Sequence, residues 1–480
     1  MAEDIQIKEA LTYDDVLIIP KYSTISSRKN TDLSTNLTIK IKLNIPMVSG
    51  NMDTVTESKM AIAMARLGGI GIIHRFMPIK DQVNEVLKVK RAEAIIIDKP
   101  YTLTPEHTLK DAKNFMEEHN INGLLITDSI GKFEGILTRR DMMFEENLLR
   151  RISEVMTPKG EAVIADFGIE TERAKMIMKE KKIEKLPLLD KNGILKGLIT
   201  AKDLMRKDYY PLTVKDKKGR LLLGAAIGVK GDYLDRAEAL INAGCDVLCV
   251  DIAHGHSELA INAIKAVKDK FPEIEIIAGN VATEEGTYDL IKAGADCIKG
   301  GLGSGAICIT RLVAGAGYPQ FSLVLKCAKV SNELGIPFMA DGGIGGITGN
   351  FSKAIAAGAS TVMRSRSLAG TDESPGIAIM RGGKKYKIYR GSASFGANMT
   401  RNQRQGEEID EEYNPEGVEA LVPYSGTVEE VIKPFLAGLR SGMSYAGAHN
   451  IKEFWKKAEF VRITQAGIKE SYPHDVELVK

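Results

Sequence analysis

The chain has 480 residues, which is too long for one ordinary compact domain, so two or three domains are expected. Charged residues make up 27% of it and apolar residues 44%, the balance of a soluble globular protein. With 65 basic and 63 acidic residues the net charge is +2, which argues against nucleic acid as a main partner.

The start of the chain, MAEDIQIKEA, lacks the basic and apolar regions of a signal peptide, and no apolar run is long enough to cross a bilayer. The five cysteines are scattered and form no CxxC pair. These features predict a cytoplasmic protein in a reducing compartment, with no membrane attachment and no metal site built on paired cysteines.

Residues 1–95 are expected to form the first part of an α/β domain. They contain IPMVSGNMDTV (45–55) and GGIGIIHR (68–75), which are typical of buried parallel strands. From about 96 to 209 this rhythm changes, which indicates an insertion.

The inserted segment contains an internal repeat. MEEHNINGLLITDSIGKFEGILTRRDMM (116–143) aligns without gaps on MKEKKIEKLPLLDKNGILKGLITAKDLM (178–205). Each copy reads helix, strand, turn, strand, and then Thr-x-x-Asp at the start of a helix. We therefore predict a tandem module with repeats at about 96–150 and 155–209.

Residues 210–480 alternate short apolar strands with amphipathic helices that end in glycine, which indicates a parallel sheet. Because about eight such units are available, a closed (β/α)8 TIM barrel is favoured over an open doubly wound sheet. Asp251, Asn280, Asp341 and Arg366 directly follow predicted strands, at the end of the barrel where such enzymes perform their chemistry.

The loop 299–312 combines a bare backbone with one thiol. Its glycines lead into Cys308, and Thr310 follows two residues later. Glycine-rich loops expose N–H and C=O groups, and a thiol becomes nucleophilic when its pKa is lowered or a base lies nearby. We predict that Cys308 is catalytic. The other cysteines are interpreted as small buried hydrophobes: Cys245, Cys249, Cys297 and Cys327.

The inserted repeat resembles a pair of CBS domains, which commonly bind adenine or guanine nucleotides. That resemblance implies a regulatory nucleotide site with Thr138, Asp141, Thr200 and Asp203, the two aspartates meeting a ribose. The alternative is that Thr-x-x-Asp is only a helix cap and the pair is structural.

Seven motifs resemble the IMP dehydrogenase/GMP reductase family over nearly the whole chain. They are LTYDDVLIIP near the start, MDTVTE (52–57), GGIGIIH (68–74), AGNVAT (278–283), GSGAICIT (303–310), ADGG (340–343) and AEFVRIT (458–464). The resemblance implies a (β/α)8 barrel that forms tetramers or octamers. It also implies a cysteine that attacks C2 of a purine nucleoside monophosphate, and a nicotinamide cofactor that exchanges hydride with that carbon.

Carried over by position, Cys308 is the nucleophile and Thr310 the hydroxyl that helps to move protons. Asp341 is the residue that holds the ribose hydroxyls, and Gly342 and Gly343 let the phosphate approach. The resemblance also implies further substrate-binding residues: Met52, Ser365, Arg366 and Tyr389.

The cofactor-binding residues implied by the resemblance are Asp251, Asn280, Gly301 and Gly303. A monovalent cation such as K⁺ is implied at a set of backbone carbonyls: Gly303, Gly305 and Cys308.

The two reactions of the family differ in their need for a base. The dehydrogenase must activate water, for which its members carry an Arg-Tyr pair on a mobile flap; the corresponding segment here, 396–419, contains no Arg-Tyr. Reductases use a Glu-Thr pair to expel ammonia, and Glu416 matches that glutamate, although dehydrogenases also keep its motif. We therefore favour a GMP reductase that uses NADPH. The alternative is an IMP dehydrogenase that uses NAD, with Arg401 or Arg404 as the flap base.

Several positions depart from the family pattern. Gly50 and Ala306 stand where a phosphate-facing serine is common, and Ser365-Arg366 replaces the usual Gly-Ser. Arg366 is interpreted as a substitute phosphate clamp; alternatively it fills the pocket and the ligand is not the usual purine monophosphate. A third hypothesis is a nucleotide sensor whose barrel has lost turnover.

Overall fold

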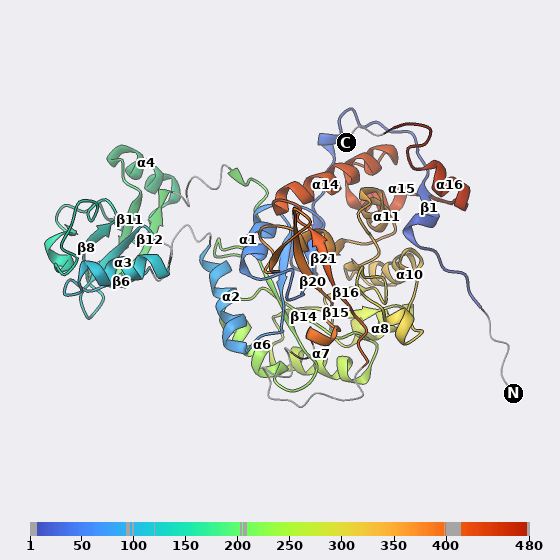
Figure 1. The fold of residues 1–480 in the computed structure, drawn as a ribbon, viewed down its shortest axis with the longest axis horizontal. Coiled ribbons are helices and arrows are strands. Elements are labelled where there is room, and N and C mark those ends of the chain that lie inside the picture. Colours follow the sequence, from blue (N-terminus) through green and yellow to red (C-terminus); the bar gives the residue numbers. More distant parts are fainter. Residues whose placement is uncertain are drawn as a thin grey trace. The chain divides into compact units, whose positions relative to one another are not determined.

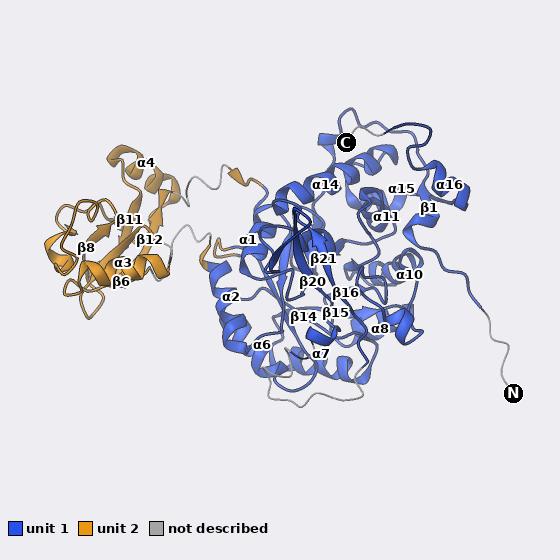
Figure 2. Ribbon diagram, in the orientation of Figure 1, with its two compact units in different colours: residues 1–90, 212–216, 221–480 blue, residues 91–211, 217–220 orange. Residues whose placement is uncertain are grey.

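The structure is a computed structural model that describes residues 7–92, 97, 100–119, 121–201, 204, 209–397, 399 and 414–477. The chain forms two compact units (Figure 2). Unit 1 comprises Met1–Lys90, Leu212–Asp216 and Leu221–Lys480, and unit 2 comprises Arg91–Pro211 and Lys217–Arg220.

The centre of unit 1 is a closed barrel of eight parallel strands, which confirms the predicted fold (Figure 1). Both N-terminal segments that the sequence marked as strands belong to it. In order around the barrel the strands are β13 (Gly224–Ile227), β14 (Val247–Val250), β15 (Glu275–Val281), β16 (Cys297–Gly300), β17 (Phe338–Asp341), β18 (Thr361–Arg364), β4 (Met47–Ser49) and β5 (Ile70–Ile73).

Helices surround these strands and cover their outer face (Figure 1). The strands are consequently buried almost throughout, as expected for a parallel barrel. The helices of unit 1 are α1 (Ser58–Arg66), α2 (Ile79–Arg91), α6 (Tyr233–Asn242), α7 (Glu258–Lys270), α8 (Glu284–Lys292), α9 (Thr310–Val313), α10 (Gln320–Glu333), α11 (Thr348–Ala356), α12 (Arg366–Ala369), α14 (Val428–Tyr445), α15 (Ile451–Lys457) and α16 (Gln465–Glu470), with 3₁₀ turns η1 (Tyr13–Asp15) and η2 (Arg28–Asn30).

Local sequence explains where several helices begin and end. The Ser257 hydroxyl accepts a hydrogen bond from the backbone of α7, and the Thr283 hydroxyl does the same for α8. Gly244 and Gly294 follow α6 and α8 with φ of 95° and 109°, which a side chain rarely adopts. The hydroxyls therefore fix where α7 and α8 begin, and the glycines end α6 and α8 so that the chain turns directly into the next strand.

Three small sheets flank the barrel. β1 (Val16–Ile18) pairs with β22 (Phe460–Arg462), and β2 (Thr35–Asn36) pairs with β3 (Lys42–Leu43). β20 (Lys384–Arg390) lies between β19 (Ala378–Arg381) and β21 (Glu419–Pro423).

The insertion begins and ends at one corner of the barrel. Lys90, almost completely buried, donates to the Leu221 carbonyl at 2.9 Å and contacts Asp216 at 3.1 Å and Asp246 at 2.6 Å. At this point of the barrel β5 pairs directly with β13, with Ile72 opposite Gly224. Unit 1 is therefore a continuous barrel in spite of the inserted segment.

Unit 2 contains two copies of the same supersecondary unit. The elements of the second copy begin 62 residues after their counterparts: α3 (Leu109–Glu118) and α4 (Thr171–Lys181), β7 (Gly123–Thr127) and β11 (Lys185–Leu189), and β8 (Phe133–Thr138) and β12 (Leu195–Thr200). The other elements among the described residues of unit 2 are the short strands β6 (Thr102–Leu103), β9 (Thr157–Pro158) and β10 (Ala165–Asp166) and the 3₁₀ turn η3 (Ile152–Glu154).

Each copy has its own apolar core, and the two copies share a third. The shared cluster contains Leu125 and Phe133 from the first copy and Leu189 and Leu198 from the second. The repeat seen in the sequence thus recurs in the structure, while its identity as a CBS pair stays a prediction.

Candidate active site

A cavity of about 610 Å³ opens where the barrel strands end. The structure brings together around it the described residues of unit 1 that the sequence singled out for catalysis, substrate or cofactor: Met52, Asp251, Asn280, Gly301, Gly303, Gly305, Cys308, Thr310, Asp341, Gly342, Gly343, Ser365, Arg366, Tyr389 and Glu416.

A chain of hydrogen bonds links the loop thiol to a carboxylate. The Thr310 hydroxyl donates to Oε2 of Glu416 at 2.7 Å, and Sγ of Cys308 lies 3.2 Å from the same hydroxyl oxygen. Because the single hydrogen of Thr310 points to Glu416, the thiol must be the donor to Thr310. The arrangement can carry a proton between Cys308 and Glu416.

Cys308 differs from the other cysteines in its exposure, since it alone is not buried. Burial raises the pKa of Cys245 and Cys249 to about 12, that of Cys327 to about 11, and that of Cys297 as well. These four thiols stay protonated at neutral pH and lie within the packed interior, as their interpretation as buried hydrophobes required.

Backbone hydrogen bonds fix the position of the loop that carries Cys308. The Ile309 N–H donates to the Glu416 carbonyl at 2.8 Å, and the Val418 N–H donates to the Ile307 carbonyl at 3.0 Å. The segment that leads into β21 is therefore paired with the loop that carries the thiol.

A buried lysine that the sequence reasoning missed joins two of the predicted residues. Nζ of Lys299 contacts Oδ2 of Asp341 at 3.3 Å and also donates to Oδ1 of Asn280. Burial alone would lower the pKa of Lys299, but the nearby carboxylates, Asp341 foremost, raise it above its usual value. Lys299 thus holds a positive charge at the centre of the barrel.

Asn280 completes this cluster. Its Nδ2 donates to Oδ2 of Asp341 at 2.9 Å and to the Gly301 carbonyl at 2.8 Å. Among the described residues, Oδ1 of Asp341 has no hydrogen-bond partner and is free to accept from a ligand hydroxyl. The sequence could have suggested Lys299 only through its position at the end of a strand.

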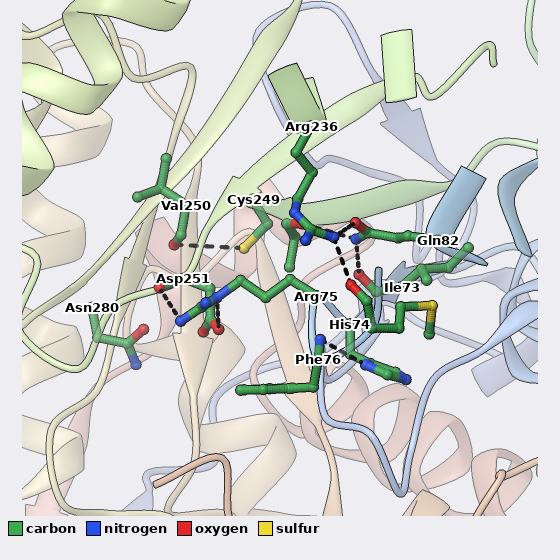
Figure 3. A network of polar contacts seen from close by, with 12 residues as sticks. Ile73, His74, Arg75, Phe76, Gln82, Arg236, Cys249, Val250, Asp251 and Asn280 are labelled. Carbon is green, nitrogen blue, oxygen red and sulfur yellow. Dashed lines mark hydrogen bonds and ion pairs between the residues drawn. The ribbon is translucent and has the colours of Figure 1, made fainter. Parts of the chain in front are cut away.

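The carboxylate of Asp251 is held by a second cation that sequence reasoning did not select (Figure 3). Nε of Arg75 donates to Oδ2 of Asp251 at 3.0 Å, and Nη2 contacts the Asp251 carbonyl at 3.4 Å. Arg75, Phe76 and Ile252 also line a neighbouring cavity of about 810 Å³. Asp251 therefore lies at the border of two hollows, a geometry that suits an elongated ligand.

The outer wall of the second cavity is built on a buried arginine (Figure 3). Arg236 donates to Oε1 of Gln82 at 2.7 Å and to the Met77 carbonyl at 3.0 Å, and it pairs with Asp232 at 2.6 Å. Because every part of this guanidinium has a partner, the wall is expected to be rigid.

The loop after β17 has two successive residues with positive φ. Gly342 and Gly343 have φ of 90° and 77°, and the Gly343 N–H donates to the Ser304 carbonyl at 3.0 Å. A Cβ on Gly342 would lie 2.6 Å from Oγ of Ser304. Both positions therefore require glycine.

Two arginines flank this loop. Arg366 is exposed and lines the cavity, so its role as a phosphate clamp or as a side chain that fills the pocket stays a prediction. Arg364, another residue that sequence reasoning missed, is buried; its Nη2 donates to the Gly345 carbonyl at 2.8 Å and its Cζ lies 4.4 Å from the Phe435 ring centroid. No carboxylate pairs with it among the described residues, and burial, with a smaller effect of Arg366, lowers its pKa to about 10.

Tyr389 faces the same end of the cavity. Its hydroxyl lies 3.7 Å from Sδ of Met52, and burial raises its pKa. The tyrosine therefore stays neutral and keeps its hydrogen for donation to a ligand.

Of the carbonyls predicted to hold a cation, that of Gly305 accepts the Cys308 N–H at 3.1 Å and retains one lone pair. Among the described residues there is no cluster of three or more His, Cys, Asp or Glu side chains that could hold a metal. Within the part of the chain that the structure describes, no helix is long and apolar enough to span a membrane.

Some predicted residues are not tested by these contacts. In unit 2 the Thr138 N–H and hydroxyl both donate to Oδ2 of Asp141, at 2.6 and 2.8 Å, which is the geometry of a cap. Thr200 ends the equivalent strand β12. Asp203, Arg401 and Arg404 lie outside the described residues.

The fold and this arrangement of side chains define an enzyme of the (β/α)8-barrel class. Comparison with known families makes the class specific, since the family described as "IMP dehydrogenase / GMP reductase domain" matches residues 10–474. The chain belongs to this family and is an NAD(P)-dependent oxidoreductase of purine nucleotides.

Relatives and solved structures carry two different names. The inosine-5'-monophosphate dehydrogenase of Nitrosopumilus maritimus is 52% identical over 479 residues, which is 99% of this chain and 100% of that protein. The inosine-5'-monophosphate dehydrogenase of Aquifex aeolicus is 50% identical over 479 residues, which is 99% of this chain and 97% of that protein. A GMP reductase from Trypanosoma brucei in complex with guanosine 5'-monophosphate superposes with a TM-score of 0.93 at 44% identity, covering 98% of this chain and 99% of that one.

Proposed function

We propose that the protein is a GMP reductase, which converts GMP to IMP and releases ammonia. The observation that carries this proposal is the hydrogen-bonded chain Cys308–Thr310–Glu416, together with the absence of an Arg-Tyr pair from the sequence 396–419. The chain provides a route for a proton to a leaving amine, whereas nothing in that sequence matches the family's water-activating pair.

In the first step the Cys308 sulfur bonds to C2 of guanine, and its proton passes through Thr310 to Glu416. Glu416 returns a proton through Thr310 to the C2 amino group, which departs as ammonia. The covalent adduct then contains a C2=N double bond. Reduced nicotinamide cofactor, when bound, supplies a hydride to C2. The C–S bond then breaks, the Cys308 thiolate departs, and the purine ring of IMP is complete.

The site residues fit these ligands. Oδ1 of Asp341 is available to accept from ribose hydroxyls, while Lys299 and Asn280 fix the orientation of that carboxylate. The two cavities that share Arg75 and Phe76 suit a dinucleotide, because the nicotinamide end must reach the purine and the rest must extend away from it.

A second candidate is IMP dehydrogenase with NAD, which is favoured by the names of the curated relatives. It would require a base that activates water, for which the sequence offers Arg401 and Arg404. In that case their replacement should abolish hydrolysis and leave hydride transfer intact.

The decisive experiment combines GMP or IMP with NADPH or NAD in four assays of the purified protein. Consumption of NADPH with GMP, together with ammonia release, supports the reductase. Production of NADH with IMP alone would overturn the direction proposed here.

We also propose NADP(H) rather than NAD as the cofactor, K⁺ at the loop carbonyls, a tetramer or octamer, and cytoplasmic location. For unit 2 we propose an adenine or guanine nucleotide site at Thr138, Asp141, Thr200 and Asp203, supported by the structural equivalence of the two copies. Calorimetry with ATP and GTP, and light scattering with and without them, test the nucleotide site and the oligomer.

A further inference from the structure

At two neighbouring strand ends in the active site, the hydroxyl of one residue occupies the space that a side chain on the other would need. Gly50 follows β4 and Ser365 follows the adjacent strand β18, and both line the 610 Å³ cavity. A Cβ on residue 50 would lie 2.1 Å from Oγ of Ser365 and 3.2 Å from its Cβ. The first distance is far shorter than any real contact, so Ser365 occupies the place of a residue-50 side chain.

Pairing and buried hydrogen bonds hold the two strand ends together. Ser49 is paired in register with Arg364, and the Gly50 N–H donates to the Arg364 carbonyl at 2.9 Å. The Gly50 carbonyl in turn accepts from the Thr56 hydroxyl at 2.7 Å. Residue 50 is therefore held at both its N–H and its carbonyl by buried hydrogen bonds.

The Ser365 hydroxyl lies among groups that suit an anion. The Ser365 hydroxyl interacts with that of Tyr389, and the cations of Arg364 and Arg366 act on the same tyrosine. The hydroxyl of Ser365 thus faces a site with another hydroxyl and two guanidinium groups, where it can donate to a phosphate oxygen.

By the resemblance to the family, these are also two positions at which the chain departs from the common pattern, which has serine at 50 and glycine at 365. We propose that the two departures are one exchange: Ser365 supplies the phosphate-binding hydroxyl that a serine at position 50 would supply, and Gly50 is required because Ser365 is present. The inference rests on the proposed purine nucleoside monophosphate ligand, and it holds for either direction of the reaction.

The test compares Gly50→Ser, Ser365→Gly and the double variant Gly50→Ser/Ser365→Gly in the full-length protein. The dissociation constants of GMP, IMP and guanosine are measured by calorimetry, and the midpoint of thermal unfolding is recorded. Ser367→Gly is the matched control, since it makes the same change two residues away and does not line the cavity.

We expect Ser365→Gly to weaken GMP and IMP about tenfold and to leave guanosine unchanged, because a charge-assisted hydrogen bond to phosphate is lost. Gly50→Ser should weaken both nucleotides and lower the unfolding midpoint. The double variant should return to within about threefold of wild-type affinity and to a wild-type midpoint, which is the non-additivity expected of two side chains that share one place.

Additive losses in the double variant overturn the exchange. So does undiminished nucleotide binding by Ser365→Gly, a loss of equal size for guanosine, or failure of the wild type to bind either nucleotide. Failure of the reductase proposal is recognised separately, as turnover with IMP and NAD only, and it leaves these binding results unaffected.

Discussion

The backbones of Cys308 and Gly417 form an antiparallel β-bridge. This bridge places Glu416, the neighbour of Gly417, on the Thr310 side of the thiol, where the Thr310 hydroxyl reaches it. The proposed nucleophile and its proposed proton acceptor come from distant parts of the chain, and a backbone contact holds them close together. Catalytic geometry here depends on main-chain pairing as much as on side chains.

Replacing Cys308 by alanine should remove turnover, with kcat at least about a thousandfold lower, because no covalent adduct can form. Nucleotide affinity should stay within a few-fold of wild type, since the sulfur contributes to bond formation rather than to ground-state binding. Steady-state assays and calorimetry measure the two effects. Cys327→Ala, a change within the core, is the control; a Cys308→Ala variant with wild-type rate would contradict the mechanism.

Replacing Glu416 by glutamine should lower kcat for ammonia release by about 10²- to 10⁴-fold, because an amide cannot accept the proton that Thr310 relays. Binding should be retained. Stopped-flow measurement of ammonia release separates this step from hydride transfer. Glu419→Gln serves as the control in the same segment; equal effects of the two substitutions would remove Glu416 from the proposed role.

Arg364→Met tests the cost of an unpaired buried charge. The pKa of Arg364 is lowered to about 10, so the unfolded chain binds more protons than the folded protein between pH 10 and the ordinary arginine pKa. Wild-type stability should therefore rise relative to the variant as the pH passes 10, by about 1 kcal/mol between pH 9 and 11. Urea unfolding at the two pH values measures this difference; a constant difference would contradict it.

Arg236→Met provides the opposite case, because Arg236 is equally buried but paired with Asp232 and bonded to Gln82. Its removal should destabilise the protein by about 3 kcal/mol at pH 7, since it leaves buried acceptors without a donor. Urea unfolding of the wild type and the variant at pH 7 measures this loss of stability. If both arginines behaved alike, the presence of a carboxylate partner would not explain their difference.

Lys299→Met should destabilise the protein by about 3 kcal/mol, because the largely buried Asp341 loses its cation. The double variant Lys299→Met/Asp341→Asn should recover most of this loss, since no uncompensated charge then remains. Denaturant unfolding of the two single variants and the double variant gives the coupling energy. A double variant as unstable as the sum of the singles would mean that the two residues act independently.

The barrel, the residues at its strand ends and the loop of Cys308 could be predicted from local rules, whereas Met52, Tyr389 and Glu416 were implied only by the resemblance to the family. Parallel strands are buried on both faces and read as short apolar runs, and Asp251, Asn280 and Asp341 stand at their carboxyl ends. The internal repeat was equally visible, because two copies of one supersecondary unit keep one spacing.

The missed residues depend on partners across the barrel. Lys299 and Arg75 acquire meaning only when Asp341 and Asp251 lie beside them, and no spacing along the chain encodes that proximity. Gly50 is a similar case, because a glycine in the sequence says that a side chain is absent but not which neighbour takes its place.

The buried ammonium group of Lys90 joins the points where the chain leaves and re-enters unit 1. Because β5 pairs directly with β13, the barrel is continuous without the inserted segment. The one geometric condition on that segment is that its two ends lie close together. A short peptide or an unrelated folded domain could therefore replace the inserted segment without shifting the strand register on which Cys308 depends.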